Sequence, residues 1–333
     1  MIRYDWNNTN YEAEAGHRNP ETNDLKLRFT PSITINENWT GYSEIDYDVN
    51  PDETGADNDG ATVSKIYAEG VYGKADIKLG RFGSFSDASH GLFFDDKVTG
   101  AEVVYAPTSN WKVKATAGRI DGVKASYGFV DALGRDVVVT VPMFGTLGVT
   151  VDGVGVDPES TSATYYGAEV LYNNGKLEAG VGYHTFGASQ TWVGDGHDNY
   201  QVVDAGVGYA FDKNVKATFD YARGNEFAGD WFSDDAYSAQ VSYKGAKADQ
   251  KGSWGAYVAY RSLSPIAALQ STCEYKNGFA GLRSLKGWEI GADYAWAKNI
   301  VSSFKYFNGK DTDSEVSGAD KVTGVWSRVD FLF

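Results

Sequence analysis

The chain has 333 residues, with 45 acidic and 30 basic side chains, a net charge of −15 and 14% aromatic residues. Nucleic acid binds to basic surfaces, so this charge excludes nucleic acid as a partner. No run of about 18 apolar residues occurs, which excludes a membrane-spanning helix. In a membrane strand, apolar residues alternate with polar ones and form no long apolar run, so this composition is compatible with a membrane barrel.

Period-two alternation starts at the first residues and recurs to the end of the chain. In the first strand, Ile2 and Tyr4 alternate with Arg3 and Asp5, which gives one apolar and one polar face. The pattern predicts sixteen strands, near 2–6, 24–35, 44–48, 63–72, 74–82, 98–106, 110–119, 163–172, 176–185, 200–210, 214–223, 235–243, 253–261, 287–297, 299–307 and 322–333.

Short and long connections follow one another between these strands. The segment 173–176, Asn-Asn-Gly-Lys, is a hairpin signal, whereas 50–60 is long, acidic and typical of a loop. This alternation predicts antiparallel neighbours with short turns on one rim and long loops on the other. The last strand ends on Phe333, which is unusual for a soluble protein but suits a strand that closes a barrel in lipid.

A soluble β-sandwich is the competing interpretation of the same alternation. Its inner face would have to pack into a core, but here the polar face of almost every strand carries charges. A water-filled lumen can hold such charges. We therefore predict an all-β, transmembrane antiparallel barrel of 16 strands that spans 1–333 as one domain, with short periplasmic turns and long extracellular loops, in the bacterial outer membrane.

Charges on the predicted inner face point to a constriction. The loop after the fifth strand, 83–97, carries Asp87, Asp95 and Asp96. The last, first and second strands become neighbours when the barrel closes, and their polar faces carry the basic residues Arg3, Lys26, Arg28 and Arg328. If the loop folds inward, its acids face a basic wall, and opposed charges sort polar solutes by a transverse field. The alternative is that these charges only solvate the lumen.

With sixteen strands, a closing Phe333 and Gly80-Arg81-Phe82-Gly83 before the loop, the chain resembles the general trimeric porins of Gram-negative bacteria. In that family the third loop forms the eyelet of a passive diffusion channel for small hydrophilic solutes and ions. The resemblance implies a homotrimer in contact with outer-membrane lipid and lipopolysaccharide. The short lead into the first strand also resembles porins with an N-terminal peptidoglycan-binding S-layer-homology domain. That resemblance implies that such a domain, like a signal peptide, is missing from a mature or trimmed chain.

The segment 119–160 departs from that pattern. Its stretch 136–152 is too hydrophobic for an ordinary exposed loop. It predicts an extra hairpin at the extracellular mouth or, alternatively, two more wall strands, which would give 18 strands. Pro142 argues against a central wall strand because proline has no backbone N–H to donate.

Catalytic and metal-binding patterns are absent from the sequence. We find no nucleophile–base set, so we predict no enzyme activity, and we expect no cofactor and no metal site. The acidic segments 57–60 and 311–313 could bind calcium, but solvated charge is the simpler interpretation. Two other functions stay open beside the passive channel: a substrate-specific channel for sugars or organic acids, and an envelope tether in which the barrel is mainly an anchor.

Overall fold

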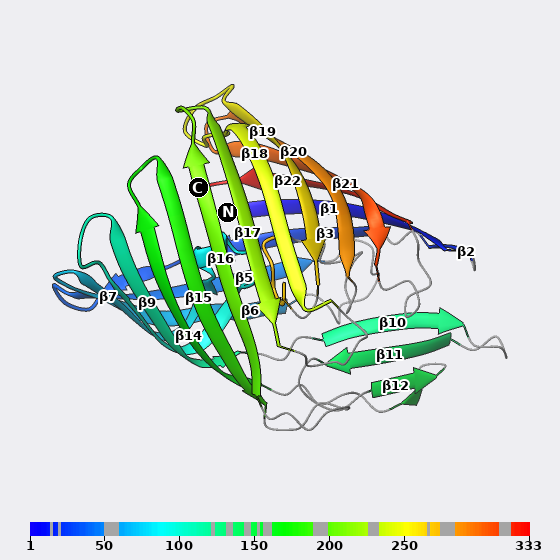
Figure 1. The fold of residues 1–333 in the computed structure, drawn as a ribbon, viewed down its shortest axis with the longest axis horizontal. Helices are drawn as coiled ribbons and strands as arrows, with labels where there is room; N and C mark the ends of the chain where they lie inside the picture. Colours follow the sequence, from blue (N-terminus) through cyan, green and yellow to red (C-terminus); the bar gives the residue numbers. More distant parts are fainter. Residues whose placement is uncertain are drawn as a thin grey trace.

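The computed structural model describes residues 1–13, 16–18, 21–49, 60–120, 124–130, 136–142, 148–151, 154–155, 162–188, 199–225, 233–264, 267–273, 284–312 and 321–333. One closed antiparallel sheet forms a barrel (Figure 1). Its sixteen wall strands are β1 (Ile2–Ala13), β3 (Glu21–Phe29), β5 (Trp39–Val49), β6 (Gly60–Tyr72), β7 (Ala75–Phe85), β8 (Asp95–Tyr105), β9 (Trp111–Ile120), β14 (Ala163–Asn173), β15 (Leu177–Ala188), β16 (Asn199–Ala210), β17 (Val215–Gly224), β18 (Asp235–Lys244), β19 (Trp254–Leu263), β20 (Leu285–Ala297), β21 (Ile300–Asp311) and β22 (Lys321–Phe331).

The barrel closes between its first and last strands. β1 pairs with β22 over eleven residues, with Ile2 opposite Phe331, so the two ends of the chain lie side by side on the short-turn rim (Figure 1). Two short segments, β2 (Gly16–Arg18) and β4 (Ser32–Thr34), extend β3 at either end, because β2 pairs with β1 and β4 with β5. Pro31 lies in the break between β3 and β4, where a missing N–H interrupts the ladder. The prediction of sixteen strands is confirmed.

The alternation gives each wall strand two different faces. Outward-facing Val181, Val207 and Phe219 keep 52, 43 and 49% of their surface exposed, although they are apolar. Asp204 points inward from β16 and is buried. Such an arrangement is stable only where the outer face meets lipid rather than water. Aromatic residues form a band on the outer face beside the short turns, from Trp39, Tyr72, Tyr105, Trp111, Tyr172, Tyr209, Tyr243, Trp254, Tyr294 and Trp296.

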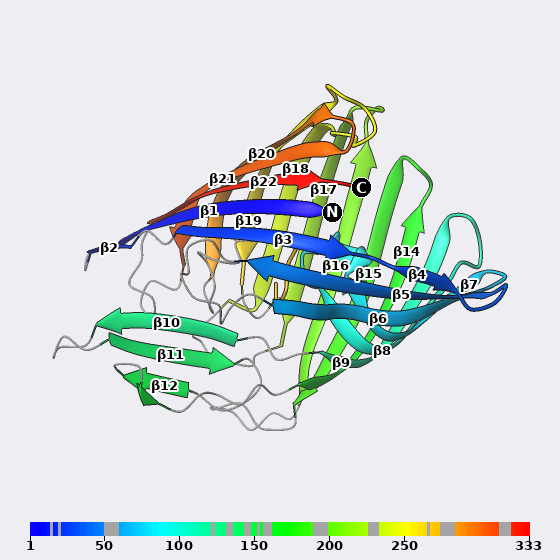
Figure 2. The same ribbon diagram turned by 180° about the vertical axis from the view of Figure 1, so that it is seen from behind.

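Strands within the insertion form a sheet of their own. β10 (Lys124–Val130), β11 (Asp136–Pro142), β12 (Gly148–Val151) and β13 (Val154–Gly155) pair with one another in an antiparallel order. Figures 1 and 2 both place β10–β12 outside the wall, at the end of the barrel away from the short turns. β9 pairs directly with β14 across the insertion, so the wall keeps sixteen strands rather than the alternative eighteen.

Candidate functional site

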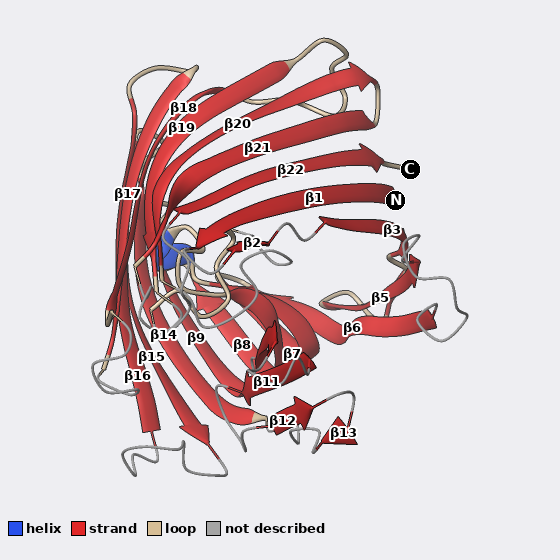
Figure 3. Ribbon diagram, turned by 90° about the vertical axis from the view of Figure 1, so that its right-hand side faces the viewer, coloured by secondary structure: helices blue, strands red, loops and turns tan. Residues whose placement is uncertain are grey.

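The hairpin of β7 and β8 leaves the wall part-way along its length. β7 pairs with β6 only up to Arg81, and β8 pairs with β9 only from Thr99. The two strands stay paired with each other beyond these points, as far as Phe85 opposite Asp95. The tip of this hairpin, residues 82–98, therefore turns into the barrel, and the short helix at its end lies inside the ring of strands in Figure 3. We call residues 82–98 the inward hairpin.

Two glycines lie opposite each other at the base of this hairpin. Gly80 has a φ of +125°, and a Cβ there would come within 2.5 Å of the Ile66 carbonyl oxygen. A Cβ on Gly100 would come within 2.1 Å of the Ala117 carbonyl oxygen. Neither approach is open to a residue with a side chain, so glycine is required where the hairpin bends away from its neighbours.

Polar contacts fix the tip of the hairpin, η1 (Asp87–Ser89), to the inner wall. The backbone N–H of Ala88 donates to Glu169 on β14 at 2.8 Å, and the Ser89 hydroxyl donates to Asp204 on β16 at 2.5 Å. Lys114 on β9 lies 2.8 Å from Asp87 and 2.8 Å from Glu169. The buried charges of Lys114, Glu169 and Asp204 are therefore partnered, as an interior of low dielectric requires.

His90 adds a second anchor directly after the short helix. Its Nδ1 lies 2.5 Å from Asp220 on β17, and its Nε2 lies 2.7 Å from Glu178 on β15. Burial opposes a charge on this imidazole, but the two carboxylates outweigh burial and raise the pKa of His90 above its ordinary value. A protonated ring donates to both acids at once, so it ties the tip to two wall strands.

A second loop joins the inward hairpin inside the lumen. Residues 267–273, between β19 and β20, run beside the returning arm of the hairpin, with a parallel bridge between Phe94 and Gln270. The N–H of Asp95 donates to the carbonyl of Gln270 at 2.6 Å, and the N–H of Thr272 donates to the carbonyl of Gly91 at 2.9 Å. The two loops thus form one partition across the barrel.

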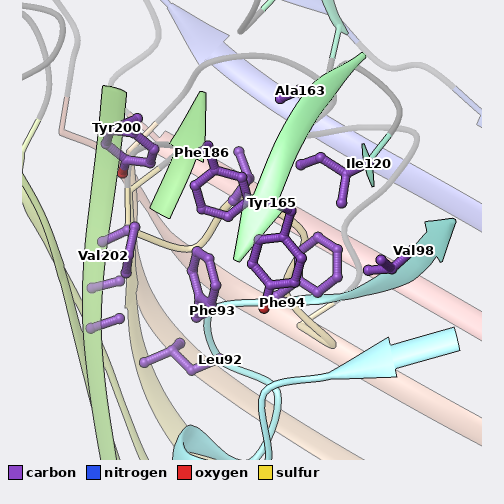
Figure 4. Packing of buried hydrophobic residues seen from close by; sticks show 14 of the residues in the cluster. Leu92, Phe93, Phe94, Val98, Ile120, Ala163, Tyr165, Phe186, Tyr200 and Val202 are labelled. Atoms are coloured by element: carbon purple, nitrogen blue, oxygen red, sulfur yellow. The ribbon is translucent and has the colours of Figure 1, made fainter. Parts of the chain in front are cut away.

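An apolar cluster fills the space between this partition and the wall of β9 and β14–β19 (Figure 4). Phe93 is buried and lies 4.6 Å from the His184 ring and 5.9 Å from the Phe186 ring, measured between centroids. The cluster consists of Phe82, Leu92, Phe93, Phe94, Val98, Ile120, Ala163, Tyr165, Phe186, Tyr200, Val202, Ala222, Ala236, Leu263, Ala267 and Leu269. We call it the lumenal seal, because close-packed apolar side chains exclude water from the space that they fill.

Sequence reasoning assigned a polar inner face to the strands and so missed this seal. Phe186 and Val202 face inward at the ends of β15 and β16 that lie away from the short turns. One signal was available: Val202 and Val203 are consecutive apolar residues, which breaks the alternation. That signal shows a strand apolar on both faces, but not what covers the inner one.

On the other side of the partition lies a cavity of about 480 Å³ that we call the charged cavity. Six of the seven residues that the sequence analysis assigned to a constriction line this cavity. The cavity lies between the wall strands β1, β3, β5, β6 and β22 on one side and the inward hairpin on the other. Its charged lining residues are the cations Arg3, Lys26, Arg28, Lys65, Lys97 and Arg328 and the acids Asp5, Asp24, Glu44, Asp46, Asp48, Asp95 and Asp96.

The wall of this cavity differs from the basic wall that we expected. Arg28 lies 2.6 Å from Asp46 and 3.2 Å from Glu44 on the neighbouring strand. Arg328 lies 2.5 Å from Asp5, across the seam where the barrel closes. Arg3 and Asp330 form a similar pair at 2.7 Å, and Lys26 lies 3.1 Å from Asp48. The four predicted cations do line the cavity, but each of them pairs with an acid on an adjacent strand. These pairs follow from the register between strands.

Asp87 is the seventh predicted residue, and the structure places it elsewhere. Its carboxylate pairs with Lys114, beneath the tip of the hairpin, rather than facing Arg28 or Arg328. The reason is the bend of the hairpin: its tip reaches the wall of β9 and β14–β17, while only the returning arm with Asp95 and Asp96 borders the charged cavity.

An aromatic ladder along the lumen would favour a sugar-specific channel. Tyr42 and Tyr67 stack on each other at 5.2 Å, and Tyr67 also contacts Phe82 edge-on. Tyr257 lies on β19 and donates to Glu289 at 2.8 Å. These three residues form one pair and one separate contact, not a ladder of exposed rings along the lumen.

Two further expectations concern metals and membrane helices. Within the described part of the chain, no three His, Cys, Asp or Glu residues come together as metal ligands. The candidate calcium segments lie outside this test, because 57–59 and 313 are not among the described residues. No helix in the described part of the chain is long and apolar enough to cross a membrane.

Comparisons with known proteins agree with this architecture. A family model described as Gram-negative porin matches residues 2–331. A solved mutant of Rh. blastica porin is similar over 99% of both chains, with 12% sequence identity and a TM-score of 0.52. Pseudomonas putida OprB, solved at high pH, is similar over 100% of this chain and 93% of its own, with 12% identity and a TM-score of 0.61. No curated protein matches this sequence.

Proposed function

The chain belongs to the Gram-negative porin family and is an outer-membrane channel for passive diffusion, and we propose that its solutes cross through the charged cavity. The solutes are small and hydrophilic, including ions. The constriction consists of Asp95 and Asp96 on the inward hairpin, facing Arg3, Lys26, Arg28 and Arg328 with their paired acids on the wall. Proteins of this family and fold are channel proteins.

One observation carries this proposal: the charged cavity is larger than the polar cavity of about 270 Å³ between His90 and the wall of β17–β19, and the lumenal seal closes the space beside it. Phe93, Phe186 and Val202 pack without exposed surface in the lumenal seal, so water and ions have no polar route there. The charged cavity offers a route of about 480 Å³ lined by thirteen charged groups among the described residues.

A thiol placed in the charged cavity tests this route. We expect that Asp96→Cys, in a Cys273→Ser background, loses most of its single-channel conductance after reaction with a bulky, uncharged thiol reagent, because the adduct occupies the charged cavity. Removing the native Cys273 leaves a single target for the reagent. The matched control is Gly245→Cys, at an exposed short turn, whose conductance should stay constant. An unchanged conductance for the modified Asp96→Cys channel would contradict the proposed route.

A homotrimer is the second part of the proposal, and the outer face of β22, β1 and β3 supports it. Several outward positions in the half of the wall beyond Tyr4 are polar there: Glu21 accepts from Trp6 at 2.8 Å, and Asn23 accepts from Tyr4 at 2.7 Å. The same level of β14–β20 carries the aromatic residues Tyr166, Tyr183, Tyr221, Tyr237, Tyr260 and Trp288. Lipid disfavours polar groups, so we infer that partner copies cover the polar face while outer-membrane lipid, including lipopolysaccharide, surrounds the aromatic one.

A bulky residue on β5, beside this face, should dissociate the trimer. Ser43 and Gly41 on β5 present small outward surfaces next to Pro31 and β4. We expect Ser43→Trp to shift the particle mass in mild detergent from three chains to one, because the larger ring prevents close approach of the partner. Ala239→Trp, on the lipid-facing side of β18, serves as the control and should keep the mass of three chains. A native protein that is monomeric at every concentration would overturn the trimer.

A further inference from the structure

A lysine on β21 faces the lumen next to the charged cavity. Lys305 lies directly opposite Trp326 in the register of β21 and β22, and Trp326 lines the charged cavity. The neighbouring Phe304 is 44% exposed on the outer face, so the alternation of the strand directs Lys305 inward. Neither Lys305 nor Trp326 was among the residues that the sequence analysis assigned to the constriction.

Lys305 differs from the predicted cations of this wall in the group that holds it. Its Nζ lies 4.8 Å from the centroid of the Trp326 ring, and the Cζ of Arg328 lies 4.5 Å from the same centroid. Arg328 also pairs with Asp5, whereas no carboxylate among the described residues forms an ion pair with Lys305. An aromatic ring therefore holds this ammonium in place of an acid.

The strand on the other side of Lys305 places no acid directly against it. The residue opposite on β20 is Gly291, and the Tyr257 ring occupies the space that a side chain on Gly291 would need. Two acids lie one inward position away on β20. Glu289 accepts from Tyr257 at 2.8 Å, and Asp293 lies nearer to the short turns and forms no ion pair with Lys305. The ammonium thus keeps its charge uncompensated on the inner wall.

The way in which Lys305 is held decides how much of its charge a passing ion meets. A carboxylate positions a cation and also cancels its charge, whereas an aromatic ring positions the cation and leaves its net charge as it is. Six cations and seven acids line the charged cavity, so the cavity by itself carries slightly more negative than positive charge. The ammonium of Lys305, held beside this cavity by Trp326, brings the two signs to equal numbers.

We infer that Lys305 favours the entry of small anions, such as chloride and short carboxylates, into the charged cavity. This inference rests on the proposed function, because it takes the charged cavity as the route of the solutes. Opposite charges that lie close together largely cancel each other's field, whereas a single charge beside a narrow path of low dielectric acts on every passing ion. Lys305 is therefore a specificity-determining residue of the channel, and Trp326 is the residue that positions it.

The reversal potential in a potassium chloride gradient, measured across a planar bilayer at low salt, tests this role. We expect Lys305→Gln to lower the permeability of chloride relative to potassium about 3-fold, and Lys305→Glu to lower it further. Lys305→Arg keeps the charge and can stack on the indole ring, so it should keep the native ratio. The matched control is Lys298→Gln, which removes the same charge from the exposed short turn of the same hairpin and should also keep the native ratio.

Two results would overturn the role of Lys305: a native permeability ratio in both Lys305→Gln and Lys305→Glu, or an equal change in Lys298→Gln, which would indicate only an effect of net charge. The thiol adduct at Asp96→Cys tests the route itself. A block by that adduct, together with an unchanged ratio in the Lys305 variants, removes the role of Lys305 and keeps the route. A changed ratio without the block supports Lys305 as the residue that favours anions and contradicts the route through the charged cavity.

Discussion

Replacing Arg28 and Arg328 together by glutamine is expected to shift the channel strongly toward cations. The change removes two positive charges from the charged cavity and leaves Asp46, Glu44 and Asp5 without their arginines. A change of roughly 1 kcal/mol in the energy of an ion in transit alters relative permeability about 5-fold. The reversal potential in a salt gradient across a planar bilayer measures this ratio. Asp46 still has its ion pair with Lys26, at 3.4 Å, in the double variant. We therefore expect the barrel wall to fold.

The opposite substitution provides the matched test. Asp95→Asn/Asp96→Asn removes two negative charges from the other side of the same cavity and should shift selectivity toward anions. Both shifts should shrink at 1 M salt, where the screening length falls to about 3 Å. Lys213→Gln/Lys247→Gln, at exposed short turns, should leave the reversal potential as it is. If both cavity variants keep the native value at low salt, the constriction lies elsewhere in the lumen.

Phe93→Ala is expected to cost about 3–5 kcal/mol of stability and to raise the conductance. Its ring is fully buried between the partition and the wall, in contact with Phe94, His184 and Phe186, so its removal leaves a cavity in the lumenal seal. A cavity of this size loosens the inward hairpin and lets water into an apolar region that otherwise excludes it. Denaturant unfolding in lipid vesicles measures the first effect, and single-channel recording measures the second.

Phe219→Ala is the control for this deletion. It removes the same side chain from the outer face of β17, where the ring is 49% exposed and contacts lipid instead of a packed core. Lipid can fill the space that the ring leaves, so the loss of stability should be much smaller and the conductance should not change. Equal losses for the two variants would show that Phe93 is not part of a sealed, close-packed cluster.

Strand positions were predicted well where alternation was strong and poorly where polar residues continue a strand. β1 was expected to end near residue 6 but runs to Ala13, because 7–10, Asn-Asn-Thr-Asn, pair with β22 despite their weak strand preference. The third strand was expected around 44–48 but starts at Trp39. The predicted strand over 24–35 is divided at Pro31. In each case pairing with a neighbouring strand overrides the local pattern.

The sequence by itself determined the barrel, because side-chain alternation and short turns are local properties that each strand carries alone. It also determined which residues line the lumen near the closing seam, since Arg3 and Arg328 must approach each other once β1 meets β22. Only the tertiary structure decided how these charges are balanced, because the pairs Arg28–Asp46 and Arg328–Asp5 depend on the register between neighbouring strands, which for Arg328 and Asp5 come from opposite ends of the chain. The lumenal seal also depended on the fold, since the rings of Phe93 and Phe186 come into contact only when the hairpin bends inward at Gly80 and Gly100.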